Sequence, residues 1–202
     1  SQAAQANRNR ERDGYCVIDT GSLRRGLVIE MDGELYRINE FHHNKQGRGS
    51  AIVRLVLKNL RTGATTTQTF QAGSRFNSVR LERVRAQFLY SDDQFYHFMD
   101  VDTFEQFQLD AETLGEATNY IVPDMVIELL TYEGEAIDIE LPTAVELEVT
   151  QTDPGFRGDT ATGGSKPAVL ETGLTIQVPL FVSQGDRVKV DTRTGEYLER
   201  VN

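Results

Sequence analysis

The 202-residue sequence contains one cysteine, no tryptophan and three histidines. Cys16 alone cannot form an internal disulfide, and so few Cys and His residues exclude the ligand spacing of a structural zinc site. No apolar run reaches the roughly 18 residues that a membrane helix needs, and residues 1–18 lack the apolar core of a secretory signal. The sequence therefore predicts a cytoplasmic protein that does not associate with a membrane.

Acidic residues outnumber basic ones and give a formal net charge of −10, but this charge is unevenly distributed. Residues 1–82 carry +5, residues 83–142 carry −12 and residues 143–202 carry −3. The basic first part permits contact with phosphates, whereas the acidic middle argues against a surface that binds polyanions everywhere. The alternative is that these charges are only solvated faces, so charge alone leaves nucleic-acid binding open.

Alternating hydrophobicity and turn residues dominate the chain after residues 1–14, which are polar, lack periodic apolar positions and should be disordered. Asp32-Gly33 predicts a tight hairpin turn, and Thr62-Gly63 marks a second connection. The strands expected on either side of these turns span residues 27–31, 34–41, 51–60 and 64–70. Four or five strands within about 60 residues indicate a small closed barrel.

The same pattern predicts a second small β unit in residues 83–142 and a third in residues 143–202. In the second unit, Asp110 can cap one short helix from Ala111 to about Tyr120. In the third, a polar loop with four Gly and two Pro is expected from Asp153 to about Pro167, and loops of this length are usually functional or disordered. The expected strands of these units span residues 84–90, 94–100, 125–132, 135–141, 145–150, 175–182, 187–191 and 197–201.

The connection between Phe41 and Ala51 is too polar to be core. Glycine on both sides of Arg48 lets the backbone turn tightly and leaves one guanidinium at the apex of a hairpin. Arginine pairs with phosphate and stacks on bases, and Lys45 would add contacts to the RNA backbone. The local pattern alone favours the alternative of a solvated turn, because G-x-G is common in turns.

An enzymatic function finds little support in the residues. Carboxylates that could act as acid and base or bind a divalent cation gather in the middle part, at Asp92, Asp93, Asp100, Asp102, Glu105 and Asp110. Asp92 and Asp93 fall in an expected turn, and the D-x-D of Asp100 and Asp102 lacks the other ligands of a calcium loop. His97 alternates within a strand and should lie at the edge of a core. We therefore expect no catalytic residue, metal site or cofactor.

Three segments of the chain carry a family resemblance. They are the G-[K/R]-G tip at residues 47–49, the aromatic run FLYSDDQFYHFMDVDTFEQF at residues 88–107, and the C-terminal stretches TDPGFRGDTATGGSKPAVLETG and VPLFVSQGDRVKVDTRTGEYLERV. In this order, and over nearly everything from Ile18 to Asn202, they resemble bacterial translation elongation factor P. Residues 1–17 lie outside the resemblance and are assigned no role. They begin without Met, which suggests an upstream extension.

The resemblance implies an all-β fold of three small β-barrels arranged as an L. An SH3-like, KOW-type barrel with a tip loop would occupy residues 18–82, an OB-fold barrel with one short helix residues 83–142, and a second OB-fold barrel residues 143–202. Residues 1–17 would form a disordered N-terminal extension. The strand pattern described above agrees with this arrangement.

The resemblance also implies a function. The chain would bind the 70S ribosome between the peptidyl-tRNA and exit sites, and would stimulate peptide-bond formation at consecutive prolines by positioning the acceptor end of the peptidyl-tRNA. It would do no chemistry itself, would contact ribosomal RNA, peptidyl-site tRNA and mRNA in the exit site, and would act as a monomer.

Individual residues match functional positions of the family. The tip loop that faces the CCA end of the tRNA corresponds to Lys45, Gly47, Arg48 and Gly49. Gly158, Asp159 and Thr160 match the loop directed toward mRNA, and Tyr197 and Arg200 match positions near small-subunit RNA.

Arg48 is also the candidate for modification. Family members extend lysine tips by β-lysylation and arginine tips by rhamnosylation, so an arginine suggests a glycosyltransferase as a partner. Rhamnosylated members commonly have Pro immediately before the first tip glycine, whereas this chain has Gln46, and an unmodified tip stays open. Two other readings also stay open: an elongation factor P-like paralogue or other RNA-binding β-barrel with a different ribosomal task, and a metal-dependent hydrolase that uses the acidic middle part.

Overall fold

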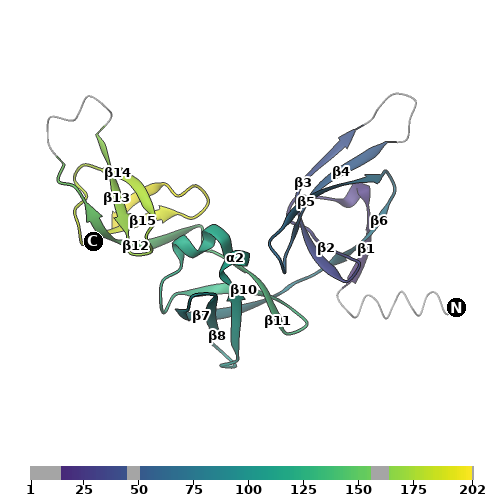
Figure 1. Cartoon of the computed structure of the whole chain (residues 1–202), viewed down its shortest axis with the longest axis horizontal. Helices are drawn as coiled ribbons and strands as arrows, with labels where there is room; N and C mark the ends of the chain where they lie inside the picture. Colours follow the sequence, from purple (N-terminus) through teal and green to yellow (C-terminus); the bar gives the residue numbers. More distant parts are fainter. Residues whose placement is uncertain (1–14, 45–50, 156–163, 202) are drawn as a thin grey trace. The chain divides into compact units, whose positions relative to one another are not determined.

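The computed structural model describes residues 15–44, 51–155 and 164–201. In these ranges the chain forms sixteen strands in three sheets and one short α-helix, which confirms the predicted all-β class (Figure 1). The chain divides into two compact units, one of residues up to Arg83 with Leu130–Asp138 and the other of Val84–Leu129 with the residues from Ile139 on. No helix in the described ranges is long and apolar enough to cross a membrane.

The first sheet has the strand order β1-β6-β2-β3-β4-β5. Its strands are β1 (Tyr15–Asp19), β2 (Val28–Met31), β3 (Glu34–Asn44), β4 (Ile52–Asn59), β5 (Thr65–Gln71) and β6 (Arg75–Val79). The predicted hairpin between β2 and β3 is confirmed, because Asp32 and Gly33 take the positive φ values, 52° and 80°, that a type I′ turn requires. The core of this sheet consists of Leu23, Ile29, Ile38, Val53, Leu55, Leu57 and Phe76.

Two strands of the first sheet depart from the sequence prediction. Residues 15–17, expected within a disordered extension, belong to β1, which pairs with β6 from Tyr15–Val79 to Asp19–Arg75. The expectation was wrong there because the partner lies about sixty residues along the chain, and local periodicity carries no sign of such pairing. β6 was not predicted for the same reason.

The second sheet has the strand order β11-β10-β7-β8-β9. Its strands are β7 (Glu82–Ser91), β8 (Phe95–Asp100), β9 (Gln106–Asp110), β10 (Val126–Tyr132) and β11 (Glu135–Glu140). The predicted cap is confirmed, because the Asp110 carboxylate accepts a hydrogen bond from the Glu112 backbone N–H at 2.8 Å. The predicted short helix is confirmed but its α-helical part is shorter than expected: α2 (Ala111–Leu114) ends at Gly115, whose φ of 54° is not helical, and a 3-10 helix continues over Gly115–Tyr120.

The turn end of the β10–β11 hairpin belongs to the first compact unit. Ile137 packs in a buried cluster with Val28, Leu35, Leu60 and Val79. Beside this cluster, an Arg37 guanidinium nitrogen lies 2.7 Å from a carboxylate oxygen of Asp138, and both side chains are mostly buried. The first unit is therefore completed by residues that follow it in sequence by about fifty positions.

The third sheet has the strand order β14-β13-β12-β15-β16. Its strands are β12 (Ala144–Thr152), β13 (Ser165–Leu170), β14 (Thr175–Pro179), β15 (Arg187–Asp191) and β16 (Tyr197–Val201). Strand β13 corrects the expected extent of the polar loop, since the chain becomes extended at Ser165, before Pro167. The proline is tolerated because the pairing of β13 with β12 ends at Ala168, so its missing N–H breaks no bond of that ladder.

Candidate nucleic-acid interface

The β3–β4 hairpin forms an arm that ends at the predicted tip loop, and β5 flanks β4 along this arm (Figure 1). Its cross-strand pairs continue out to Asn44–Ile52, and β5 pairs with β4 equally far, to Ile52–Gln71. On β4 the side chains of Val53 and Leu55 are fully buried, whereas residues 41–44 of β3 are exposed. The arm is thus anchored through one strand and exposes the other.

Basic and titratable groups lie on the exposed part of this arm. Arg54 is exposed and stands opposite His42 in the ladder. The His42 Nε2 atom lies 3.4 Å from the Glu40 carboxylate, and both side chains are more than half exposed. The predicted site residues of the tip, Lys45, Gly47, Arg48 and Gly49, lie outside the described residues.

Both described ends of the C-terminal loop meet at Leu180. A Cβ on Gly155 would lie 2.5 Å from the Leu180 carbonyl oxygen, so only glycine fits there without a backbone shift. At the other end, the Leu180 N–H donates to the Gly164 carbonyl at 3.2 Å. The predicted RNA-facing residues Gly158, Asp159 and Thr160 lie between these ends, outside the described residues.

Lys166 joins the start of this loop to strand β13. The residue is 8% exposed, and its ammonium donates a hydrogen bond to the Asp153 backbone carbonyl at 2.6 Å. Burying an ammonium is costly unless a polar partner receives it, so this bond holds the loop end and the lysine together. Sequence reasoning missed Lys166 because it falls in a polar run that was expected to be loop.

Tyr197 and Arg200, both predicted from the resemblance, lie on β16 and differ in their surroundings. Tyr197 is half-buried and packs against the barrel core, whereas Arg200 is exposed. A guanidinium nitrogen of Arg200 lies 3.6 Å from the Asp186 carboxylate, and its guanidinium carbon lies 5.2 Å from the centroid of the Phe181 ring. The structure therefore brings Arg200 together with Phe181, a residue that sequence reasoning missed.

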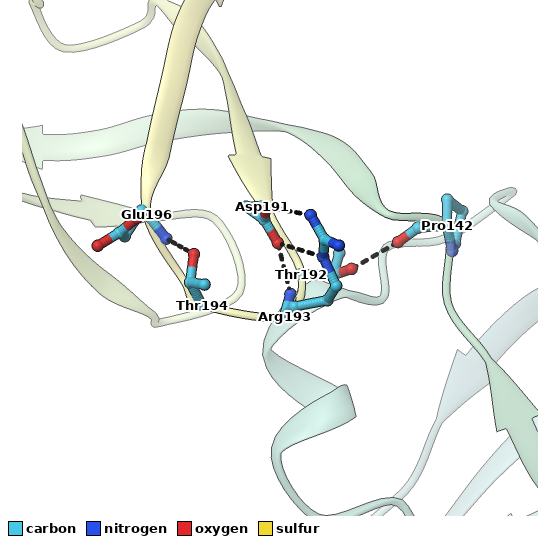
Figure 2. Close-up of polar contacts among 6 residues, drawn as sticks. All are labelled: Pro142, Asp191, Thr192, Arg193, Thr194 and Glu196. Atoms are coloured by element: carbon cyan, nitrogen blue, oxygen red, sulfur yellow. Dashed lines mark hydrogen bonds and ion pairs between the residues drawn. The ribbon is translucent and has the colours of Figure 1, made fainter. Parts of the chain in front are cut away.

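The turn between β15 and β16 joins the C-terminal barrel to the segment that leads into it (Figure 2). The Thr192 hydroxyl donates to the Pro142 carbonyl at 2.5 Å, and the Thr192 N–H donates to the Thr143 carbonyl at 3.1 Å. Asp191 accepts from the Arg193 backbone N–H at 2.8 Å and pairs with its guanidinium at 3.0 Å. The side-chain hydrogen bond from Arg193 is the main cause that lowers the pKa of Asp191.

Tyr120, the last residue of the 3-10 helix that follows α2, lies in the core of the C-terminal barrel, where it packs with Val145, Leu147 and their neighbours. Next to it, the Thr172 hydroxyl donates to the Asn119 carbonyl at 2.7 Å. Burial, followed by the nearby Glu116 and Asp191 charges, raises the pKa of the Tyr120 hydroxyl. The two barrels of the second compact unit therefore share packing as well as a covalent connection.

The carboxylates of the middle barrel close turns. Asp92 accepts from the backbone N–H groups of Gln94 and Phe95 at 2.9 and 2.7 Å, and lies 2.7 Å from His97 Nε2. The His97 hydrogen bond is the main cause that lowers the pKa of Asp92 to about 2. Asp100 accepts in the same way from the N–H groups that follow it. In the described ranges, no group of three or more His, Cys, Asp or Glu could hold a metal ion.

Family models match the chain in three consecutive parts. The elongation factor P KOW-like domain matches residues 19–76, the elongation factor P OB domain residues 81–139, and the elongation factor P C-terminal domain residues 145–200. Together with the three sheets, these matches define a translation factor built from a KOW-like domain and OB-type barrels.

Curated relatives that match over their full length show which translation factor family the chain belongs to. A protein of Moorella thermoacetica named elongation factor P is 55% identical over 184 residues, which cover 91% of this chain and 100% of that protein. Another of that name, from Thermoanaerobacter sp., is 51% identical over 185 residues and covers 92% of this chain and 100% of its own. The chain belongs to the bacterial elongation factor P family and is a translation elongation factor.

Among solved structures, eukaryotic translation initiation factor 5A from Methanococcus jannaschii matches with a TM-score of 0.51 and 22% identity. The match covers 63% of this chain and 93% of that one. At this identity the likeness concerns the fold only.

Proposed function

We propose that this factor binds the 70S ribosome between the peptidyl-tRNA and exit sites and stimulates peptide-bond formation at consecutive prolines. Its partners would be ribosomal RNA, peptidyl-site tRNA and mRNA in the exit site. It would work as a monomer in the cytoplasm and use no cofactor. Membership of the family supports a role in translation, and the β3–β4 arm supports the finer assignment.

The paired arm is the observation that carries the proposal. Cross-strand pairing persists to Asn44–Ile52, so residues 45–51 connect two strands that are held in register. The +5 charge of residues 1–82 also favours an approach to phosphates.

Arg48 would act by positioning. The ring of proline fixes its φ and restricts how the nascent end can be oriented. A planar guanidinium, with Lys45 nearby and with glycine freedom at Gly47 and Gly49, can contact phosphates and bases of the tRNA acceptor end. Holding that end in place removes part of the entropic cost of the bond-forming step, which the ribosome itself carries out.

The C-terminal barrel would contact RNA on the small subunit. Gly158, Asp159 and Thr160 would face mRNA, which is supported by the fixed ends of their loop at Leu180. Arg200 would face small-subunit RNA, since it is exposed and lies beside Asp186 at the end of β16. Tyr197, half-buried against the core, would support that strand while it contacts RNA.

The test replaces Arg48 by Ala and measures synthesis of a peptide with consecutive prolines in a reconstituted translation reaction. We expect stimulation to fall to the level without factor, and the melting temperature to stay within about 1 °C, because a polar side chain of the predicted tip loop should contribute little stability. Arg75→Ala, at an exposed arginine of β6 outside the β3–β4 arm, is the matched control and should keep full stimulation. Full stimulation by Arg48→Ala would refute the tip assignment.

We further propose that a glycosyltransferase modifies Arg48. The arginine at the tip supports this, while Gln46 departs from the Pro that such tips commonly have. Mass spectrometry of the Arg48 peptide from protein purified out of its native host should show a deoxyhexose-sized increase. Fully active protein with an unmodified Arg48 would contradict the modification and show that the bare guanidinium suffices.

A further inference from the structure

We propose that a recess beside Phe181 on the C-terminal barrel binds one unstacked base of single-stranded RNA. The inference rests on the proposed function for the choice of RNA as partner. It adds a stacking contact to the residues already assigned at positions 158–160, 197 and 200.

The recess is an open hollow of about 490 Å³. Its lining includes Thr152, Asp153, Lys166, Leu180, Phe181 and Gln184. Its floor is fixed, because Gly155 lies against Leu180 and the buried Lys166 is bonded to Asp153. A hollow of this size with mixed apolar and polar walls suits a flat heteroaromatic group with hydrogen-bonding edges.

Phe181 presents its ring to solvent although it stands in an apolar segment. It is 59% exposed, whereas the next residue, Val182, is fully buried in the barrel core. Core packing therefore does not account for the choice of a phenylalanine at this position. An exposed aromatic ring at the edge of a hollow is the element on which nucleic-acid-binding OB folds stack bases.

Arg200 supports the ring from one side. Its guanidinium carbon lies 5.2 Å from the ring centroid, within the range of a cation–π contact. Asp186 lies 3.6 Å from this guanidinium and also accepts from the Ser183 backbone N–H at 2.9 Å, so the same carboxylate fixes both the arginine and the turn after Phe181. The ring and the cation are thus held together before any ligand arrives.

The location of the recess favours single-stranded RNA. Lys166 lies on the second strand of the barrel, and Asp153 begins the loop between the first and second strands. OB folds bind oligonucleotides at the second and third strands and at this loop. Arg200, which is exposed and lies against the Phe181 ring, places a positive charge where a phosphate that flanks a stacked base would lie.

The chain contains no tryptophan, so Phe181→Trp introduces a single fluorophore that can itself stack on a base. We expect a single-stranded hexauridine RNA to quench the emission of full-length Phe181→Trp, and the same backbone with abasic sugars to quench it at least about 5-fold less at equal concentration. Phe104→Trp, at a phenylalanine of the middle barrel that is 69% exposed, is the matched control and should not be quenched. Absence of quenching at about 1 mM RNA, or equal quenching by the abasic strand, would overturn the proposal.

Phe181→Ala tests the same contact without a fluorophore in the protein. Its affinity for a dye-labelled hexauridine should fall about 5- to 100-fold relative to wild type, while Phe104→Ala should match wild type. An unchanged affinity of Phe181→Ala would overturn the stacking role.

Chemical probing of bases in 70S complexes separates the two sources of RNA. Protection of an exit-site codon base that Phe181→Ala loses would identify mRNA, and protection of a small-subunit ribosomal base that it loses would identify ribosomal RNA. Identical protection by both proteins at every base would overturn the site on the ribosome. The Arg48→Ala translation assay is independent of these readouts, so a failed base site and a failed tip assignment can be told apart.

Discussion

The N-terminal and C-terminal barrels hold the ends of their predicted RNA-facing loops in different ways. The tip loop follows a ladder that stays paired to Asn44–Ile52 and is anchored by buried side chains of one strand. The C-terminal loop is closed by contacts at a single residue, Leu180, which meets one loop end by close approach and the other by a hydrogen bond. The tip loop is therefore supported by many paired residues, whereas closure of the C-terminal loop depends on Gly155, Gly164 and Leu180 alone.

Leu55→Ala should have the largest effect, because it removes a fully buried side chain on the anchored strand of the arm. We expect a loss of about 2–5 kcal/mol in the free energy of unfolding of the N-terminal barrel, from lost burial and a residual cavity. Urea denaturation measures this loss. The neighbouring exposed Arg54→Ala should stay within about 0.5 kcal/mol of wild type, and equal losses in both variants would show that the arm is not anchored through one face.

Gly155→Ala should have the next largest effect. Its new methyl group would meet the Leu180 carbonyl oxygen, and relieving this overlap by a backbone shift should cost about 1–3 kcal/mol in the C-terminal barrel. Gly164→Ala is the control, since its Cβ would meet nothing closer than 3.9 Å and would cost only the strain of a φ of 67°, about 1 kcal/mol. A milder loss for Gly155→Ala than for Gly164→Ala, measured by thermal unfolding, would remove the distinction between the two ends.

Thr192→Val tests whether the stability of the C-terminal barrel depends on its contact with the segment at Pro142 that leads into it. The change removes the hydroxyl that donates to the Pro142 carbonyl and should cost about 1 kcal/mol. Amide hydrogen exchange of residues 143–150 and 187–191 should become faster by the factor to which this loss of free energy corresponds. Thr194→Val loses only an acceptor for the Glu196 N–H at 3.3 Å and should exchange as wild type does. Equal acceleration in both variants would contradict a specific role of the Thr192 contact.

The β7–β8 turn of the middle barrel is stabilised in a third way, by the ionised carboxylate of Asp92. Because the pKa of Asp92 is lowered from 3.8 to about 2, its contribution to stability is complete above pH 4 and is lost as the pH falls from about 4 to 2. His97→Gln removes the main cause and should raise the pKa of Asp92 toward 3.8, as measured by an NMR titration of its carboxyl carbon. Asp93→Asn, at the adjacent turn residue, is the control and should leave that pKa near 2. A pKa still near 2 in His97→Gln would assign the shift to the backbone N–H groups instead.

Turn chemistry made much of the fold predictable from the sequence. Asp32-Gly33 takes the paired positive φ values of a hairpin turn, and the alternating runs beside it are strands β2 and β3. β9 was missed although its residues alternate polar and apolar, whereas two other missed strands, β1 and β13, lack such a local signal. β1 pairs with a partner distant in sequence, and β13 begins within a polar run and contains Pro167.

The candidate site was predictable only where a motif or the resemblance pointed to it. Arg200 was identified in that way, but its partner Phe181 was assigned to a strand expected to reach Val182, whereas β14 ends at Pro179. A signal was present in the sequence, because three consecutive apolar residues after a proline cannot all face one core. Lys166 gave no signal at all, since the burial of a lysine in a polar segment depends on the distant carbonyl that receives it.

Both ends of the C-terminal loop are held at Leu180, so we expect that residues 156–163 can be replaced by another sequence without loss of the barrel. The barrel fixes the two points of attachment whatever sequence lies between them, and the entropic cost of a longer connection grows only slowly with its length. Recognition of a new partner could therefore be introduced between Gly155 and Gly164 by replacing this segment alone, with the strands of the barrel left as they are.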